Sequence, residues 1–367
     1  MFIHILIMMG WYYMNIYSSI KFADIVFEGG GGVKGIGLVG ALKPFEQKGY
    51  HWKNICGNSA GSIVAALVAV GYSSDEIKKL MIDLDYTKIA DKNYSIMPFF
   101  SNAHNLLFKK GLFKGDYIKN WIDDALSNKL KLHSKKKVTF GDLIIPDEKG
   151  ILLNNIKYKR KYKLHIIATD ISRGKMIILP EDIAEYGINP DEFEVGLAIR
   201  MSISIPYFFQ PVKLFKKNSN RKSLIVDGGV LSNYPVWIFD VNGIPDWPTI
   251  GFKLGGNKEI REHKITNILN FTSSIIETML EAQDDIHISE MDFLRTVKID
   301  TLDIKTTDFN IESKKIIDLY NSGEACARSF LQNFESDFKK HRIMRVNSLN
   351  NRTFKRICDS FTSNGIC

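Results

Sequence analysis

Short apolar runs that end at glycine alternate along the chain with longer segments of helical periodicity. An apolar run over 24–28 leads into glycines, and the apolar residues from Ile36 to Phe45 then recur every three or four positions. A second run at 54–56 meets glycine again and is followed by a strongly apolar segment over 62–70. Each pair is typical of a buried strand, a tight turn and a helix.

Similar signals continue through the rest of the chain. Ser73 and Glu76 have the spacing of a capping box, which predicts that a helix begins there. The other patterns predict strands at 164–169, 176–179, 224–226 and 249–254, and helices at about 116–130, 193–203, 265–281 and 312–334. Because strands that alternate with helices usually pair in parallel, we expect an α/β sandwich around a largely parallel sheet.

The N-terminal residues 2–13 are mostly apolar, but they fit no standard targeting segment. No Lys or Arg precedes them and no small-residue cleavage site follows, which argues against a secretory signal. His4, Gly10 and Asn15 interrupt the run, so it is short for a membrane span. Three interpretations stay open, namely an interfacial anchor, an element packed on the domain and an extension without a role, and the last two are favoured.

The composition is that of a soluble globular protein. Of the 367 residues, 45% are apolar and 25% are charged, which excludes a disordered chain, a collagen-like chain and a polytopic membrane protein. A chain of this length buries a core without structural metals or disulfides. The four cysteines include no closely spaced pair, so a zinc site of the usual Cys-x-x-Cys type is excluded.

Basic residues exceed acidic ones, and the excess is clustered. The net charge is +8 and the pI is about 9.0. The basic clusters lie at 135–137, 157–163, 213–222 and 339–356. Most such clusters are simply solvated faces, and the functional alternatives are an anionic membrane surface and nucleic acid. Because the chain has no zinc-finger, RNP or basic-zipper motif, we expect no nucleic-acid partner and favour the membrane.

The segment Gly57-Asn58-Ser59-Ala60-Gly61 lies between a predicted strand and a predicted helix. A serine on such a tight, strained turn projects its hydroxyl at the top of the sheet, and side chains in place of the flanking glycines would clash with the turn. The helix that begins at Ala60 directs its positive end at the place where negative charge develops during acyl transfer. The pattern alone also arises by chance, but its context favours Ser59 as a nucleophile.

A run of glycines, Gly30-Gly31-Gly32-Val33-Lys34-Gly35, follows the first predicted strand. Consecutive glycines leave main-chain N–H groups free to converge on an anion. A dinucleotide site would need an acidic residue near 53–57 and a Walker loop would need Gly-Lys-Ser/Thr, and the chain has neither. The run fits an oxyanion hole for acyl transfer, with Lys34 either beside an anionic head group or solvated at the start of the helix.

Asp227-Gly228-Gly229 follows the predicted strand at 224–226. An aspartate at the end of a strand can accept the proton of a serine within hydrogen-bond reach, although an Asp-Gly turn is the simpler explanation of this element taken alone. A histidine base is the competing hypothesis. The chain order nominates His263, His287 or His341, none of which is framed by glycines or stands at an evident strand end.

Together these segments resemble the patatin-like phospholipase family. The glycine run, the Ser59 turn, the segment Ala198–Pro206 and the block Asp227–Pro235 are similar to four motifs of that family, in its order, over about residues 22–255. The resemblance implies a three-layer α/β/α sandwich with a mainly parallel central sheet. It also implies hydrolysis of acyl esters in lipids by a Ser–Asp dyad, without a metal or cofactor. Glu28, Gly29 and Asn58 depart from the residues that the family often has at those positions.

The family's site residues carry over by position. Ser59 corresponds to the nucleophile and Asp227 to its general base, while the oxyanion hole corresponds to the backbone of Gly30, Gly31 and Gly32. The supporting positions are Gly57, Gly61, Lys34, Gly35, Gly228 and Gly229. The aromatic stretch 85–112 and Phe208-Phe209 are candidates for lining an apolar substrate groove, although core packing is slightly favoured for both.

The resemblance also sets expectations for organisation and partners. We expect an apolar extension over 1–21, a patatin-like catalytic domain over 22–255, and a mostly helical part over 256–367 that packs on or completes the same domain. The expected partner is a phospholipid or another acyl lipid at a membrane surface, with the protein cytoplasmic or peripherally bound and an activating partner left open. The alternative is a catalytically idle lipid or nucleotide sensor, which the intact serine, aspartate and glycine run disfavour.

Overall fold

The computed structural model covers the whole chain and describes most of it. The described residues are 21–30, 32–89, 109–132, 136–145, 160–216, 221–241, 245–255, 274–275, 278, 289–302, 304 and 311–363, with only the backbone for 346–363. The N-terminal segment 1–20 and most of the helix expected at 265–281 therefore lie outside the described residues. In the described part of the chain, no helix is both long and apolar enough to cross a membrane.

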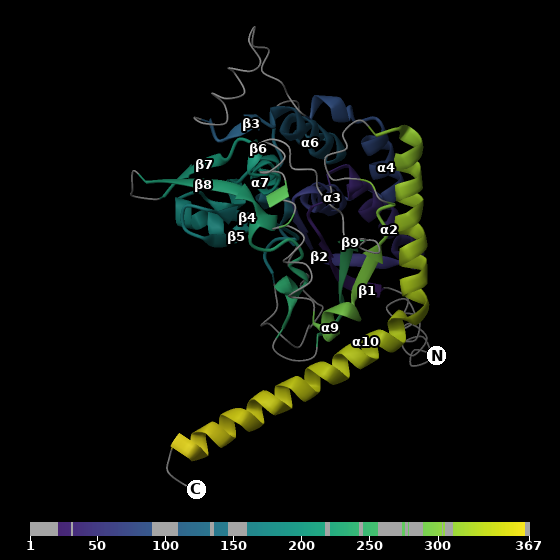
Figure 1. The fold of residues 1–367 in the computed structure, drawn as a ribbon, viewed down its shortest axis with the longest axis vertical. Helices are drawn as coiled ribbons and strands as arrows, with labels where there is room; N and C mark the ends of the chain where they lie inside the picture. The colour runs from purple at the N-terminus through teal and green to yellow at the C-terminus, as the bar shows by residue number, and fades with distance from the viewer. Residues whose placement is uncertain are drawn as a thin grey trace, which may run out of the picture.

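A mixed sheet forms the centre of the molecule (Figure 1). Its order is β10-β9-β1-β2-β4-β8-β7, and β5 pairs with β4 beside this path. The pairs from β10 to β4 are all parallel, whereas β5, β8 and β7 join antiparallel. The strands are β1 (Lys21–Phe27), β2 (Tyr50–Asn58), β4 (Leu164–Asp170), β5 (Lys175–Leu179), β7 (Val212–Phe215), β8 (Lys222–Asp227), β9 (Thr249–Leu254) and β10 (Thr296–Ile299).

Helices cover one face of this sheet in two tiers. The inner tier, α2 (Gly35–Gln47), α3 (Ala60–Ala69) and α7 (Val195–Ser202), packs directly on the strands. The outer tier is α4 (Ser74–Ile82), α6 (Asp116–Lys129) and the first part of α10 (Ser313–Ser363), which runs beside α2 and α4 and also contacts the edge strand β10 (Figure 1). The main core lies between the strands and these helices. The predicted α/β sandwich around a mainly parallel sheet is confirmed.

The opposite face carries a smaller apolar cluster. This cluster contains Val26, Cys56 and Ile167, one residue each from β1, β2 and β4. Along each strand these residues alternate with those that face the main core, and they pack against the 3₁₀ helix η9 (Val236–Phe239). The other short elements are η1 (Gly32–Lys34), η2 (Tyr86–Lys88), η4 (Phe140–Leu143), η6 (Glu181–Tyr186), η7 (Pro190–Glu192), η8 (Gly228–Val230), α9 (Glu290–Phe293) and a two-stranded sheet of β3 (Gly111–Phe113) and β6 (Tyr207–Phe209).

Local signals explain several of the observed boundaries. Helix α4 begins after Ser73, whose hydroxyl accepts from the Glu76 N–H while the Glu76 carboxylate accepts from the Ser73 N–H, so the predicted capping box is confirmed. Helix α10 continues well beyond the predicted end at 334 because no Gly or Pro interrupts 335–363. Its last part extends away from the rest of the chain (Figure 1).

The sheet register brings distant segments to one rim. Strands β1 and β2 are parallel neighbours, so Phe27 and Asn58 end at the same edge. Asn58 pairs with Ile167 of β4, and the next residue of β4, Ala168, pairs with Asp227 at the end of β8. The loops that follow β1, β2 and β8 therefore meet at this edge.

Candidate active site

Ser59 occupies a strained turn between β2 and α3. Its backbone has φ 48° and ψ −125°, a combination that L-residues rarely adopt outside special turns. Its N–H donates to the Ser202 hydroxyl at 2.8 Å, and its carbonyl accepts from the Ser62 hydroxyl at 2.6 Å. Both backbone groups of the turn are thus fixed, and Ser59 lies at the N-terminal, positive end of α3.

Close backbone packing explains the two glycines that flank Ser59. A Cβ atom on Gly57 would lie 2.3 Å from the Gly61 carbonyl oxygen, and one on Gly61 would lie 2.4 Å from the Glu28 carbonyl oxygen. Both distances are far shorter than van der Waals contact. The turn can therefore sit against β1 only with glycine at both positions.

The structure brings Asp227 to Ser59. The Ser59 hydroxyl donates to Asp227 Oδ2 at 2.6 Å, and the N–H of Gly229, in η8, donates to Oδ1 at 2.8 Å. Asp227 is buried, and this burial raises the pKa of its carboxyl from the ordinary 3.8 to about 7, while the two hydrogen bonds oppose part of the rise. A carboxylate in this position can accept the serine proton directly.

The glycine run lies beside the same contact. Gly30 and Gly32 have φ of 68° and 46°, the left-handed region that glycine adopts without strain, and Gly31 between them lies outside the described residues. The N–H of Gly29 donates to the Asn233 carbonyl, which ties the run to the segment after Asp227. Lys34 ends η1, and Gly35 begins α2 with room for a Cβ atom, so its packing does not require glycine.

Two asparagines connect the three segments, and no local sequence pattern predicted these contacts. The Asn58 side chain donates to the main-chain carbonyls of Ser232 and Asn233. Gly29 packs between the two amides, because a Cβ atom there would lie 2.4 Å from Asn233 Oδ1 and 2.6 Å from Asn58 Nδ2. Gly228 packs on the Asn58 side chain as well. Asn58 had stood out only as a departure from the family motif.

Of the three competing histidines, His341 is described, and it does not enter this geometry. Among the described residues, the hydrogen bonds to the Asp227 carboxylate come from Ser59 and Gly229. His341 lies in α10, where burial next to Arg295 and Arg345 lowers its pKa to about 4. His263 and His287 lie outside the described residues.

The candidate groove residues divide into two sets. Tyr86 and Phe209 are buried in the main core, and Phe208 packs on Phe113 with the ring centres 4.9 Å apart. The other aromatic residues of the stretch, Tyr94, Phe99, Phe100 and Phe108, lie outside the described residues.

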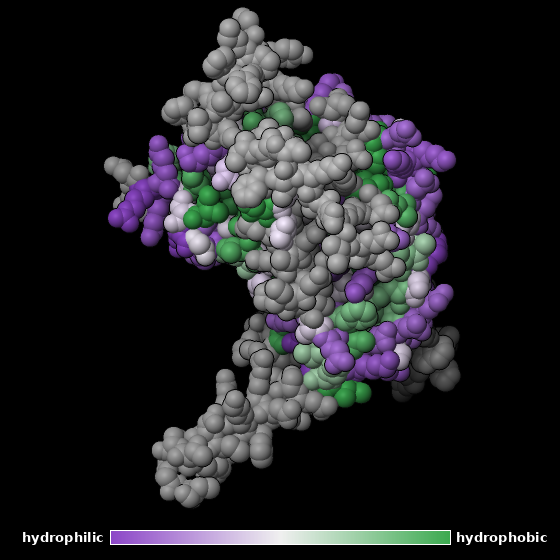
Figure 2. Space-filling view, in the orientation of Figure 1, coloured by the Kyte–Doolittle hydropathy of each residue, from purple (hydrophilic) through white to green (hydrophobic). Residues whose placement is uncertain are grey.

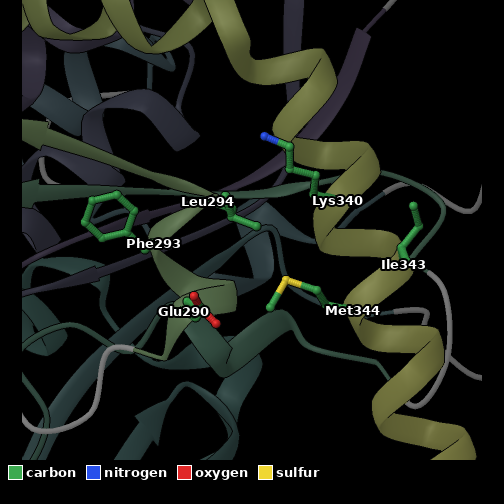
Figure 3. A pocket seen from close by; sticks show the side chains of 6 residues that line it. All are labelled: Glu290, Phe293, Leu294, Lys340, Ile343 and Met344. Atoms are coloured by element: carbon green, nitrogen blue, oxygen red, sulfur yellow. The ribbon is translucent and has the colours of Figure 1, made fainter.

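A separate open pocket lies between α9 and α10, lined by Phe293, Leu294, Ile343 and Met344 with Glu290 and Lys340 (Figure 3). It contains none of the residues of the Ser59 site.

Ser202 contacts the Ser59 turn, and the sequence analysis did not single it out, although it lies in the segment Ala198–Pro206. Its hydroxyl accepts the Ser59 N–H and donates to the Ile167 carbonyl at 2.6 Å. We expect Ser202→Ala to lower kcat for ester hydrolysis about 10- to 100-fold with little change in KM, because the strained turn loses its anchor. Steady-state kinetics on a soluble ester measure this effect.

Ser204→Ala is the matched control for Ser202. Both serines are fully buried, and the Ser204 hydroxyl bonds to Arg200 instead of the turn. Each substitution is expected to lower the free energy of unfolding by about 1–3 kcal/mol, since each leaves buried polar groups without a partner. Equal loss of kcat in both variants would show that Ser202 acts through stability alone, and restored kcat in Ser202→Thr would support positioning.

A family model and several known proteins match this chain. The model of the family described as patatin-like phospholipase matches residues 26–240. The uncharacterized protein YqhO of Bacillus subtilis (strain 168) is 38% identical over 313 residues, which cover 85% of this chain and 98% of YqhO. The probable lipid hydrolase 463L of Invertebrate iridescent virus 6 is 27% identical over 230 residues, 61% of this chain and 67% of 463L.

Among solved structures, VipD from Legionella pneumophila matches with a TM-score of 0.49 and 16% sequence identity, over 86% of this chain and 67% of VipD. The family match includes the end of β1, the Ser59 turn and the Asp227 block, and it spans more than half of the chain. This protein belongs to the patatin-like phospholipase family.

Proposed function

We propose that this protein is a lipid acyl hydrolase of the phospholipase A or lysophospholipase type, with Ser59 as nucleophile and Asp227 as general base. The observation that carries the proposal is the 2.6 Å hydrogen bond from the Ser59 hydroxyl to the buried Asp227 carboxylate, on a turn with positive φ. Family membership and the name of the viral relative, probable lipid hydrolase, support lipid as the substrate class.

The reaction has two steps. Asp227 accepts the Ser59 proton while the serine oxygen attacks the ester carbonyl, and the C–O bond to the alcohol then breaks as Asp227 returns the proton to that alcohol. Water attacks the resulting acyl-Ser59 ester, again with Asp227 as base. The fatty acid leaves and the Ser59 hydroxyl is restored.

The oxyanion of each tetrahedral intermediate needs fixed donors. We assign this role to main-chain N–H groups of Gly30, Gly31 and Gly32, assisted by the N-terminal end of α3. Gly57, Gly61 and Gly228 allow the three segments to pack closely, and Gly229 holds the second oxygen of Asp227. In the same proposal, residues 22–255 are the catalytic domain, and the part after 255 completes it through β10 and α10.

Lipid analysis tests the proposal. The wild-type protein and Ser59→Ala are incubated with mixed phospholipid vesicles, and mass spectrometry identifies released fatty acids and lysolipids. We expect release by the wild type only, and an acyl adduct on the Ser59 peptide after rapid quenching. Lipid binding by both proteins without release by either would support a catalytically idle sensor instead.

A further inference from the structure

We propose that the β7–β8 hairpin docks the protein on an anionic membrane. This inference rests on the proposed function. It adds the surface of the protein that binds the lipid membrane. The basic hairpin, as we call it, consists of Lys213, Phe215, Lys216 and Lys222, all of which are exposed. In Figure 1 it projects from the body of the molecule.

Three of the four side chains of the basic hairpin, those of Lys213, Phe215 and Lys222, share one face, and Lys216 follows directly after β7. Lys213 and Phe215 point to solvent while Leu214 between them is buried, as strand alternation requires. Phe215 pairs across the ladder with Lys222, whose ammonium lies 5.5 Å from the ring centre. Phe215 is 55% exposed, and Tyr207 of β6 is another exposed aromatic ring. An aromatic ring among lysines is the combination that membrane interfaces bind.

The lysines of the hairpin differ from those basic residues of the described chain that form ion pairs. Lys129 pairs with Glu76 at 2.7 Å, and Lys161, from the cluster at 157–163, pairs with Asp191 at 2.6 Å. Within the described residues, Lys213, Lys216 and Lys222 form no ion pair. Their charge is therefore available to an anionic surface, whereas the charge of the paired lysines is already neutralised locally.

The hairpin contains the strand that carries Asp227 of the candidate active site. Strand β8 begins at Lys222 and ends five residues later at Asp227. At the usual rise per residue of a strand, Lys222 therefore lies about 17 Å from Asp227. Strand β4 also continues past the level of Asn58 on this side. The hairpin thus projects beyond the rim that holds Ser59. Figure 2 shows hydrophilic residues on the described part of the hairpin and hydrophobic surface beside them.

Protection of the sheet edge is the structural alternative. Strand β7 is the terminal strand of the sheet, and exposed lysines on an edge strand prevent pairing with other chains. That role explains Lys213 and Lys216 but not a large exposed Phe215, which makes an edge more adhesive. Lipid binding accounts for the lysines and for the ring together.

Vesicle sedimentation tests the proposal on full-length Ser59→Ala protein, so that turnover does not alter the vesicles. The test variant adds Lys213→Gln, Lys216→Gln and Lys222→Gln. We expect the parent to bind phosphatidylcholine vesicles with about 30% phosphatidylserine much better than pure phosphatidylcholine at about 0.1 M salt, and weakly at about 0.5 M. The triple variant should bind the anionic vesicles on the order of a hundredfold more weakly.

The matched control replaces Lys79, Lys314 and Lys315 with glutamine. These lysines are also exposed and form no ion pair within the described residues, and they lie on α4 and α10, away from the hairpin (Figure 1). The control should bind like the parent, and Phe215→Ser alone should weaken binding at both salt concentrations. Equal binding by the hairpin variant and the control would overturn the proposal and leave edge protection as the function of the lysines.

The outcome is independent of the proposed catalysis. If wild-type protein hydrolyses no acyl ester, soluble or vesicular, the proposed function fails, but hairpin-dependent binding by the Ser59→Ala protein still stands. If the wild type hydrolyses a soluble ester and vesicle binding ignores the hairpin, only the docking surface is wrong. Melting temperatures close to that of the parent exclude misfolding of the variants.

Discussion

Ester hydrolysis by Ser59→Ala is expected to fall at least about a thousandfold below the wild-type rate, because the acyl-enzyme has no other oxygen on which to form. The hydroxyl of Ser59 donates to Asp227 and sits on a turn held at both backbone groups. Alanine keeps the turn but removes the reacting atom. Initial rates on a soluble short-chain ester, together with labelling by a fluorophosphonate, measure the loss.

Ser127→Ala provides the control for this experiment. The Ser127 hydroxyl donates to the Lys136 carbonyl near the surface, so its removal deletes a hydrogen-bonded serine at a site without catalytic groups. It should hydrolyse and label like the wild type. If Ser59→Ala retains more than about a tenth of the activity while its thermal unfolding is unchanged, Ser59 is not the nucleophile.

The main elements of the fold were predictable because each carries a strong local signal. Glycines end the runs that become β1 and β2, and the segments after them have helical periodicity, so both strand–turn–helix units could be predicted. Strand β10 (Thr296–Ile299) was missed because it has only four residues, and its place beside β9 is a long-range pairing. Strands β3, β6 and β7 were missed because each has only three or four residues.

The candidate site was predictable at its glycine-framed residues and not at the residues that join them. Ser59 and Asp227 stand at strand ends next to glycines, which made both positions recognisable. Ser202 lies at the end of α7, and its contact with the Ser59 N–H crosses 143 positions of sequence. Asn58 reaches the Asn233 carbonyl across 175 positions. Such contacts depend on how strands and helices are arranged, which local pattern does not specify.

Asp227→Asn is expected to lower kcat/KM about 100- to 10,000-fold while making the fold more stable at neutral pH. The amide has little basicity, so the Ser59 proton has no acceptor. The buried carboxyl has a pKa of about 7, against an ordinary value of 3.8, so its ionisation opposes folding. Removing that charge should raise the free energy of unfolding at pH 8 by roughly 1–3 kcal/mol.

The pH dependence of wild-type activity should follow the same carboxyl. The base works only when deprotonated, so kcat/KM should rise with pH and level off above about 7. The contribution of Asp227 to stability has the opposite sign. Between about pH 4 and pH 7 the folded protein keeps a proton that the unfolded chain has lost, so stability falls as pH rises through that window.

Asp318→Asn makes the same chemical change on the exposed side of α10, and it should alter neither the rate nor the pH profile. Rates between about pH 5 and pH 9 and chemical denaturation at the two ends of that range measure both effects. A profile without an inflection near neutral pH, or an Asp227→Asn protein that is inactive but less stable than the wild type at pH 8, would contradict the assignment. In that case ionisation of the buried Asp227 carboxyl would not oppose folding, and this carboxyl would not be a base with a raised pKa.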